Sequence, residues 1–253
     1  MRGLTRALLV SVPLALAGCP KDEPPAARSP QRESKLGAQR CSGQPGLKNV
    51  VLPVLQRPFD GHYPVINLFD HDLPRVSDLK SIIEGDKELT YCGLEALGLA
   101  EGFPGYAFAM PEGTPVLAAA DGEVVRAGAA PTFNCVLTHR MVDDQLEVHV
   151  EHSTLGNIGF RTHYAHLSKL TVKVGDRVVA GQRVGVAGRS GCATTNALYF
   201  EVRRLTGTKD GRSTVVDPYG WDGPSPDPWA QDERGATSLY LWKPNEAPQL
   251  KSR

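Results

Sequence analysis

The stretch Asn196–Val202 alternates small, apolar and aromatic residues in a way that predicts a β-strand. Side chains two residues apart point to the same face of a strand, so the stretch presents two distinct faces. One face is apolar and is expected in the core: Leu198, Phe200 and Val202. The other face is expected to carry any functional site on this strand: Ala197, Tyr199 and Glu201.

Similar short apolar runs, separated by turn residues, precede this strand. Five of them read as strands: Val116–Ala119, Gly122–Gly128, Asn134–His139, Leu146–His152 and Phe160–His166. Two more short strands are expected between residues 174 and 185, bending at Gly175 and Gly181. The pattern predicts an all-β fold, a small antiparallel β-sandwich or barrel with an irregular N-terminal wrapping segment and a C-terminal tail.

The chain of 253 residues divides into five predicted parts. They are a signal peptide (1–18), a disordered tether (19–53), a wrapping segment (54–101), the β domain (102–204) and a tail packed on that domain (205–253). The wrapping segment contains two histidines, and covering the domain is a better account of them than metal binding: His62 and His71. The three tryptophans of the tail are expected to pack on the domain: Trp221, Trp229 and Trp242.

The N-terminus predicts export to the cell envelope. Arg2 and Arg6 precede a short apolar run, Leu8–Ala17, that is too short to span a bilayer. The run ends in Leu-Ala-Gly-Cys, which resembles a bacterial lipobox and implies a lipid on Cys19. The alternative is an ordinary signal peptide followed by an incidental cysteine. The lipobox predicts a lipid-anchored protein facing the periplasm, and Pro20 favours the outer membrane.

The charge balance argues against nucleic acid as a partner, and the cysteine content indicates disulfide bonds. The chain has 28 Lys and Arg against 28 Asp and Glu, so there is no basic excess of the kind that nucleic-acid binding requires. Four cysteines follow Cys19, and an even number in an oxidising compartment indicates disulfides: Cys41, Cys92, Cys135 and Cys192. Three pairings are possible; Cys41–Cys92 with Cys135–Cys192 is preferred, but the connectivity stays open.

Five motifs in order carry a resemblance to a known family. They are Pro111–Val116, Ala120–Val125, Tyr164–Ser168, Gly175–Gly188 and Phe200–Val202. The series resembles the lysostaphin/LytM-type endopeptidases over roughly residues 102–204. This resemblance implies a small antiparallel β-sandwich with a long groove. Active members use one zinc to hydrolyse peptide cross-links in bacterial cell walls.

The same resemblance places the residues of the site. The His and Asp that bind zinc in the family correspond to Phe103 and Ala107, and the His-x-His pair corresponds to Ala197 and Tyr199. Only His166, in the Tyr-x-His-Leu motif, is retained. A catalytic zinc needs about three protein ligands and an open position for water. At these family positions the chain lacks such ligands.

Other histidines are not expected to restore the metal. His149 and His152 lie at odd spacing on one strand, as do His163 and His166, so each pair should face opposite sides of the sheet. His139 and His163 are expected to have structural roles. We therefore expect no cofactor, and zinc only if the domain is catalytic after all.

The sequence predicts a non-catalytic envelope lipoprotein and not an enzyme. Its expected partner is peptidoglycan or a cell-wall amidase that it regulates, with the membrane reached through the lipid on Cys19. Two alternatives stay open. One is an active zinc metalloendopeptidase that cleaves cross-link peptides; the other is a purely structural envelope lipoprotein.

Overall fold

The structure is a computed structural model that describes residues 50–71, 73, 83–84, 87–88, 102–135, 138–153, 158–205, 213–221 and 226–250. These residues all lie within one compact unit, Arg32–Arg253. The predicted signal peptide, nearly all of the tether, Cys19, Cys41 and Cys92 lie outside the described residues. Within the described ranges, no helix is long and apolar enough to cross a bilayer.

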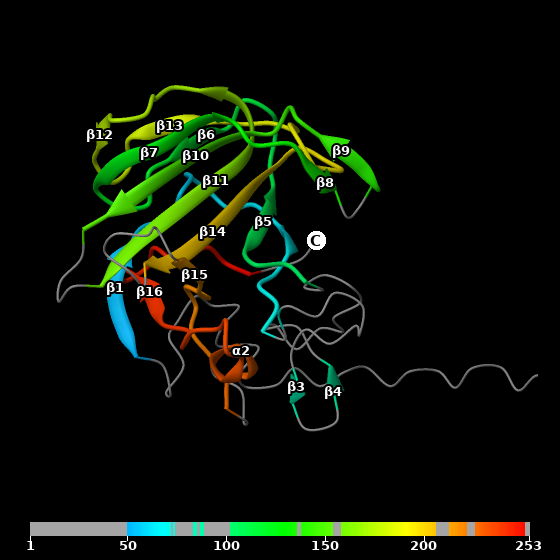
Figure 1. Ribbon diagram of the computed structural model, residues 1–253. Helices are drawn as coiled ribbons and strands as arrows, with labels where there is room; N and C mark the ends of the chain where they lie inside the picture. Colours follow the sequence, from blue (N-terminus) through cyan, green and yellow to red (C-terminus); the bar gives the residue numbers. More distant parts are fainter. Residues whose placement is uncertain are drawn as a thin grey trace, which may run out of the picture. The chain divides into compact units, whose positions relative to one another are not determined.

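A single antiparallel sheet dominates the molecule (Figure 1). Its main path runs β12 (Arg177–Val178), β7 (Gly122–Ala129), β10 (Leu146–His152), β11 (Gly159–Leu170), β14 (Ala197–Leu205), β5 (Tyr106–Ala109) and β2 (Val65–Asn67). Off this path, β13 (Arg183–Ala187) pairs with β11 and β6 (Pro115–Leu117), and β15 (Ser213–Val215) pairs with β14. The prediction of an all-β, antiparallel fold is confirmed.

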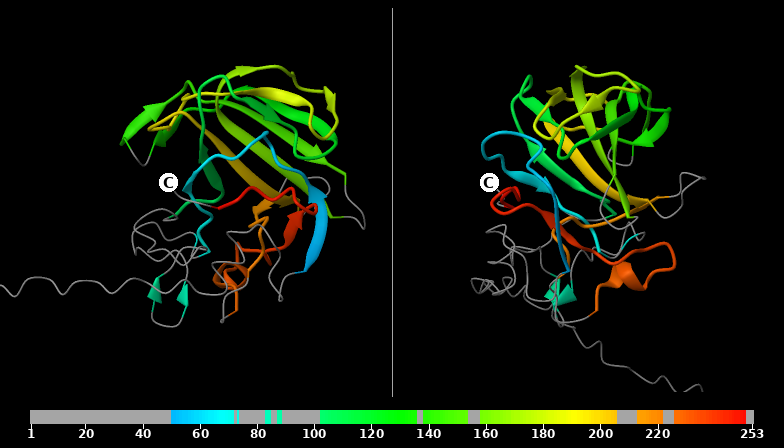
Figure 2. Two further views of the ribbon diagram at one scale, coloured as in Figure 1. Left: turned by 180° about the vertical axis from the view of Figure 1, so that it is seen from behind. Right: turned by 90° about the vertical axis from the view of Figure 1, so that its left-hand side faces the viewer.

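Short elements complete the described chain. β1 (Val51–Leu55) runs parallel to β16 (Tyr240–Trp242), and both views of Figure 2 show the two strands side by side. β3 (Ile83–Glu84) pairs with β4 (Lys87–Glu88), and α2 (Pro228–Gln231) is a single helical turn. The predicted strand Asn134–His139 is instead part of a hairpin, in which β8 (Phe133–Cys135) pairs with β9 (Arg140–Val142).

The hydrophobic core lies against one face of β14. Leu198, Phe200 and Val202 are at most 1% exposed, which confirms the core face predicted from alternation. The Phe200 ring lies 5.8 Å from that of Trp242, whose ring lies 5.4 Å from that of Tyr219. The C-terminal residues therefore cover the core face of the sheet with aromatic side chains.

Two glycines turn the chain where bends were expected. Gly175 and Gly181 have φ angles of +88° and +82°, in the left-handed region that side chains with a Cβ rarely adopt. The turn between them brings Arg177 and Val178 alongside β7. These glycines fix the edge of the sheet next to β7.

His71 lies buried at the junction of the N-terminal and C-terminal segments. Its Nδ1 is 2.7 Å from Asp227 Oδ1, and its Nε2 is 2.9 Å from Asp217 Oδ2. Burial alone would lower the pKa of His71, but the two carboxylates outweigh burial and raise it. His71 thus ties the wrapping segment to the tail, whereas His62 is exposed.

Candidate functional site

The face of β14 opposite the core presents Ala197, Tyr199, Glu201 and Arg203. The Tyr199 hydroxyl donates to Glu201 Oε2 at 2.5 Å, and Arg203 Nη1 donates to Glu201 Oε1 at 2.7 Å. Glu201 is only 4% exposed, so its charge is held by these neighbours and not by solvent. The outward face predicted for this strand is therefore a partly buried polar site.

The positions that match the family's zinc ligands do come together. Tyr199 lies opposite Ala107 in the pairing of β14 with β5, and the Phe103 and Tyr199 rings are 5.3 Å apart in an edge-on contact. Burial, followed by the neighbouring Glu201 carboxylate, raises the pKa of Tyr199 well above its usual value. Phe103 and Ala107 offer no donor atom and the Tyr199 phenol stays protonated, so these residues do not fit a zinc ion.

His166 reaches this site through an irregularity in β11. Leu146 pairs with Leu167, whereas Val148 pairs with Tyr164. Over this interval β11 therefore contains one more residue than β10, which is a β-bulge. His166 has φ of +64°, which is uncommon for a residue with a side chain. The His163 and His166 rings lie 5.2 and 6.0 Å from the Tyr199 ring. The expectation that these two histidines face opposite sides is wrong, because the bulge interrupts the alternation.

Next to these positions, a row of polar side chains crosses four strands. Arg126 pairs with His149 between β7 and β10, His149 pairs with His163 between β10 and β11, and His163 pairs with Glu201 between β11 and β14. Directly paired side chains on one face of a sheet lie within contact distance of each other. The imidazole rings of His149 and His163 are 4.2 Å apart.

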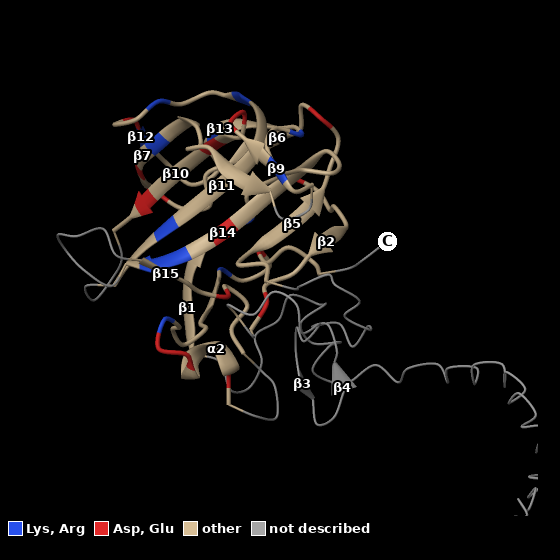
Figure 3. Cartoon of the chain, turned by 45° about the vertical axis from the view of Figure 1, so that its right-hand side comes forward, with Lys and Arg blue, Asp and Glu red and all other residues tan. Residues whose placement is uncertain are grey.

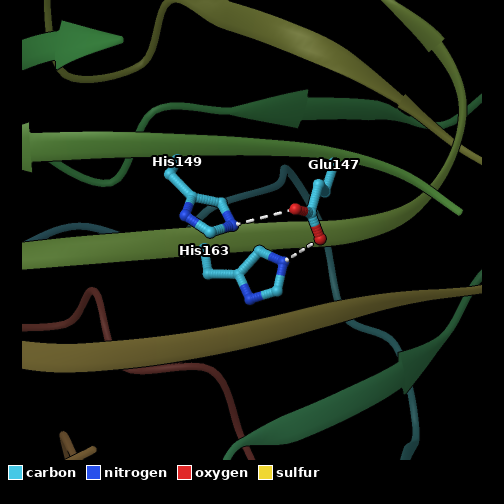
Figure 4. Close-up of side chains that lie close together, drawn as sticks. All are labelled: Glu147, His149 and His163. Carbon is cyan, nitrogen blue, oxygen red and sulfur yellow. Dashed lines mark hydrogen bonds and ion pairs between the residues drawn. The ribbon is translucent and has the colours of Figure 1, made fainter. Parts of the chain in front are cut away.

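Within this row, Glu147, His149 and His163 form a group that could hold a metal ion (Figure 4). Each offers one ligand atom, and these atoms all lie within 4.8 Å of one another. Glu147 Oε2 is 3.0 Å from His163 Nε2, and Glu147 Oε1 is 3.4 Å from His149 Nε2. Glu147 is on the same face as His149 because the two residues are separated by one position on β10.

The charges around this group are closely balanced. Burial would raise the pKa of Glu147, but His149 and His163 hold it well below its usual range. Burial would lower the pKa of His163, yet Glu147 and Glu201 raise it. Arg126 Nε is in ion-pair contact with Glu147 Oε1. Figure 3 shows this intermixing of acidic and basic residues along β10, β11 and β14.

The group has the donor atoms that a zinc ion requires. Two imidazoles and one carboxylate form a ligand set known from catalytic zinc sites. His149 Nε2 is buried, and its 3.4 Å contact with Glu147 Oε1 does not have the geometry of a hydrogen bond. Burial also lowers the pKa of His149, which favours the neutral ring that ligates metals. Glu147, His149 and His163 therefore offer the donor atoms that Phe103, Ala107 and Tyr199 lack, and His163, whose pKa is raised, would release its proton on binding a metal.

A shallow pocket of about 50 Å³ opens beside Tyr199. Its apolar walls include Phe103, Ala107 and Ala197, and its polar lining includes His166, Thr194 and Thr195. Cys192, which also lines it, is joined by a disulfide to Cys135 at the end of β8. This is one of the pairings that the sequence left open.

A comparison with protein families covers the strands that carry these residues. The model of peptidase family M23 matches residues 102–218, from the segment before β5 to the residues after β15. Residues 102–218 belong to peptidase family M23. The M23 domain therefore contains the polar row, the family's ligand positions and most of the pocket lining.

Two relatives of the M23 domain are named for cell division and for peptidoglycan hydrolysis. The cell division protein DipM of Caulobacter vibrioides is 39% identical over 110 residues, covering 43% of this chain and 15% of DipM. The peptidoglycan DD-endopeptidase ShyA of Vibrio cholerae is 37% identical over 95 residues, covering 38% of this chain and 19% of ShyA. The chain thus spans less than a fifth of the length of either relative.

Among solved structures, the antimicrobial peptidase lysostaphin from Staphylococcus simulans matches with a TM-score of 0.41 at 22% identity. The match covers 66% of this chain and 53% of that chain.

Two expectations from the sequence are corrected by these findings. The expectation that the chain is not an enzyme is wrong, because it carries a group that could bind metal and matches a relative named as an endopeptidase. The expectation of no cofactor is wrong for the same reason, since the family and the donor group both point to zinc. His163, expected to be structural, is part of that group.

The missed residues left a partial signal in the sequence. Glu147 and His149 stand two apart in a predicted strand, which places a carboxylate and an imidazole on one face. His163 joins them only through the register between β10 and β11, which pairs it with His149. The spacing along one strand predicts that Glu147 and His149 lie together, but it does not predict that His163 joins them.

Proposed function

We propose that this chain is a zinc-dependent endopeptidase that acts on the peptides of peptidoglycan, with Glu147, His149 and His163 as its metal ligands. The observation that carries the proposal is this donor group, partly buried on the face of the M23 domain's sheet opposite the core. The group lies close to the residues that correspond to the family's own ligands: His163 pairs with Glu201, and Tyr199 lies two residues before Glu201 on the same face of β14.

A zinc ion supplies two effects at such a site: it lowers the pKa of a bound water to near 7 and polarises a carbonyl group. The chain's own residues contribute the rest. His166 donates its Nδ1 proton to the Ser190 carbonyl oxygen at 3.0 Å, so Nε2 of the neutral ring is free to accept a proton. Burial lowers the pKa of His166 and keeps the ring neutral.

Glu201 orients neighbouring groups. Burial would raise the pKa of Glu201, but His163, Arg203 and Tyr199 bring it to about 2, so it stays a carboxylate. Its Oε1 lies 3.9 Å from His163 Nδ1 and favours the ring orientation in which Nε2 points toward Glu147. Glu201 thereby helps hold one member of the donor group in place.

We further propose that the protein works in the cell envelope, anchored by a lipid on Cys19. The support is the lipobox-like sequence that ends at Cys19 and a relative named as a peptidoglycan endopeptidase. Metabolic labelling with radioactive palmitate should mark the wild-type protein and leave a Cys19→Ser variant unlabelled.

The central experiment measures bound zinc and hydrolysis on the same preparations. Wild-type protein is expected to bind one zinc per chain and to release soluble peptide fragments from purified peptidoglycan, detected by liquid chromatography. His163→Ala and Glu147→Gln should each lower both zinc content and hydrolysis at least tenfold. His62→Ala, at an exposed histidine outside the M23 domain, is the matched control and should change neither.

Two results would contradict the proposal. One is peptidoglycan or amidase binding with neither zinc nor hydrolysis in the wild-type protein. The other is full zinc content in His163→Ala and in Glu147→Gln, which would place the metal elsewhere.

A further inference from the structure

We propose that the segment Lys169–Arg183, which contains β12 and its flanking turns, is a surface that binds the anionic phospholipids of a membrane. We call this segment the β12 edge, because β12 ends the main path of the sheet on this side (Figure 1). Neither the metal ion nor hydrolysis is needed for this binding. Three features of the chain support it: exposed apolar side chains, an excess of positive charge, and the length of chain that precedes the domain.

Two valines of the β12 edge are exposed although their side chains are apolar. Val174 is 60% exposed and Val179 is 62% exposed. Each lies in a turn: the Asp176 N–H donates to the Lys173 carbonyl oxygen at 3.1 Å, and the Gln182 N–H donates to the Val179 carbonyl oxygen at 2.9 Å. These turns hold both valines away from the core, so their exposure is built into the fold.

The backbone of the β12 edge is fixed to its neighbours by hydrogen bonds. The Gly175 N–H donates to the Val124 carbonyl oxygen at 2.8 Å, and the Ala180 N–H donates to Asp121 Oδ1 at 2.7 Å. A surface that is already ordered loses little conformational entropy when it binds. The two exposed valines are therefore presented in a fixed arrangement.

The same segment carries an excess of positive charge. Its single acidic residue is Asp176, and its four basic residues are all exposed: Lys169, Lys173, Arg177 and Arg183. The β12 edge therefore has a net charge of +3, in a chain whose 28 basic and 28 acidic residues balance. Figure 3 shows basic residues along the chain that runs above β12 and β13.

The acidic groups nearby leave these positive charges available. Asp176 Oδ2 accepts the backbone N–H of Lys173 at 2.9 Å, and Glu123 of β7 lies opposite Arg177. None of the four basic side chains forms an ion pair with a carboxylate of the described residues. Each Lys or Arg that is brought close to an anionic membrane surface strengthens binding about fivefold.

The combination of these groups favours a lipid surface over a protein partner. A stable protein interface buries about 800 Å² on each side around an apolar centre. Two separate valines among four charged side chains do not provide such a centre. At a membrane, apolar side chains enter the boundary between headgroups and acyl chains, while Lys and Arg meet the anionic headgroups.

The length of the preceding chain would keep the β12 edge within reach of a membrane. Residues 20–49 separate Cys19 from Val50, the first residue that the structure describes. A flexible chain of this length has a root-mean-square end-to-end distance of about 30 Å. With the lipid proposed for Cys19, the domain would stay near the bilayer, so that individually weak contacts could hold the β12 edge on its surface.

Vesicle binding by a chain of residues 20–253 tests the proposal. This chain lacks the signal sequence and the proposed lipid but contains the whole compact unit Arg32–Arg253. It is sedimented with vesicles of phosphatidylcholine, or of equal parts phosphatidylcholine and phosphatidylglycerol. We expect binding to the anionic vesicles to be at least tenfold tighter and to weaken as salt is added, because salt screens exposed charges.

Two double variants separate the contribution of charge from that of apolar contact. Lys173→Gln with Arg177→Gln should weaken binding to the anionic vesicles at least tenfold, because two cationic contacts are lost. Val174→Ser with Val179→Ser should weaken it at least fivefold, because two apolar side chains no longer enter the bilayer. Circular dichroism shows whether each variant is folded.

Matched controls make the same kinds of change at exposed positions elsewhere. Arg140→Gln with Arg234→Gln removes two positive charges, and Val51→Ser with Met141→Ser removes two apolar side chains. Both controls should bind the anionic vesicles as tightly as the unchanged chain does.

Equal binding to neutral and anionic vesicles, or variants of the β12 edge that bind no more weakly than the controls, would overturn the proposal. Weaker binding in the charge variant alone would also overturn it, because the valines would then make no contact with the bilayer. Binding to purified peptidoglycan without binding to vesicles would assign the positive charges to the wall and not to a membrane.

Discussion

Thr162 shows how much one buried hydroxyl contributes at the residue scale. Its Oγ1 hydrogen-bonds His152 Nε2 at 2.8 Å and the Tyr164 hydroxyl at 2.9 Å. All three side chains are buried on the core side of β10 and β11. Burial lowers the pKa of His152 and raises that of Tyr164 to about 12, so both stay neutral and depend on this hydroxyl.

Thr162→Val should therefore destabilise the protein with little change in volume. Leaving buried polar groups without their partner costs about 1–3 kcal/mol in the free energy of unfolding. Urea denaturation measures the loss. Thr171→Val is the matched control, because the Thr171 hydroxyl also donates a hydrogen bond, to the Arg183 carbonyl oxygen, but is exposed. An equal loss in both variants would show that the buried network contributes nothing.

The face of the sheet on which His166 lies could not be predicted from the sequence. Alternation along β14 correctly separated Leu198 and Phe200 from Tyr199. The same rule failed on β11, because a single residue in the left-handed region shifts every later side chain relative to the earlier ones. No glycine or proline marks this bulge, so local composition does not reveal it.

At the scale of elements, the site depends on register between strands. Arg126, His149, His163 and Glu201 come from four strands and meet because their pairing places them in one row. The strands themselves were predictable from apolar alternation. Their register was not, since it is set by turns and by core packing far from each strand. The donor group was therefore visible in the sequence only as separate residues.

At the scale of elements, the Cys135–Cys192 disulfide should contribute measurably to the free energy of unfolding. Cys135 and Cys192 are separated by 57 positions, and closing such a loop restricts the unfolded chain. The double variant Cys135→Ser with Cys192→Ser should lower the free energy of unfolding by about 2–4 kcal/mol, measured by guanidinium titration.

Reducing agent provides the comparison for this pair. It should shift the unfolding midpoint of the wild-type protein by more than that of the double variant. Identical shifts would mean that the Cys135–Cys192 link does not form in the protein.

At the scale of the whole molecule, His71 connects segments that lie far apart in the sequence. It bonds Asp217 and Asp227, which lie 146 and 156 residues away. The raised pKa of His71 means that its pairing stabilises the fold fully below about pH 6.5 and loses this effect as pH rises through the folded value. The lowered pKa of Asp227 means that its contribution is lost as pH falls below 3.8 toward the folded value.

His71→Gln should consequently lower the free energy of unfolding most in mildly acidic solution. We expect a loss of about 3 kcal/mol in the free energy of unfolding at pH 5–6, and a smaller loss above pH 8. Urea titrations at both pH values measure the difference. His62→Gln changes an exposed histidine of the same segment and should show little effect at either pH. If His71→Gln lowered the free energy of unfolding more at high pH than at low pH, the pairing of His71 would not favour its protonated form, and the prediction would be wrong.

The parallel pairing of β1 with β16 has a consequence for how the protein is made. Arg57 N donates to Glu246 Oε2, a contact that spans 189 positions, and Val51 pairs with Tyr240. Neither contact can form on the ribosome until the residues after 240 have been synthesised. β1 therefore cannot pair with β16 until the ribosome has synthesised the other strands of the described chain. The pairing of β1 with β16 is therefore among the last contacts that this fold can complete.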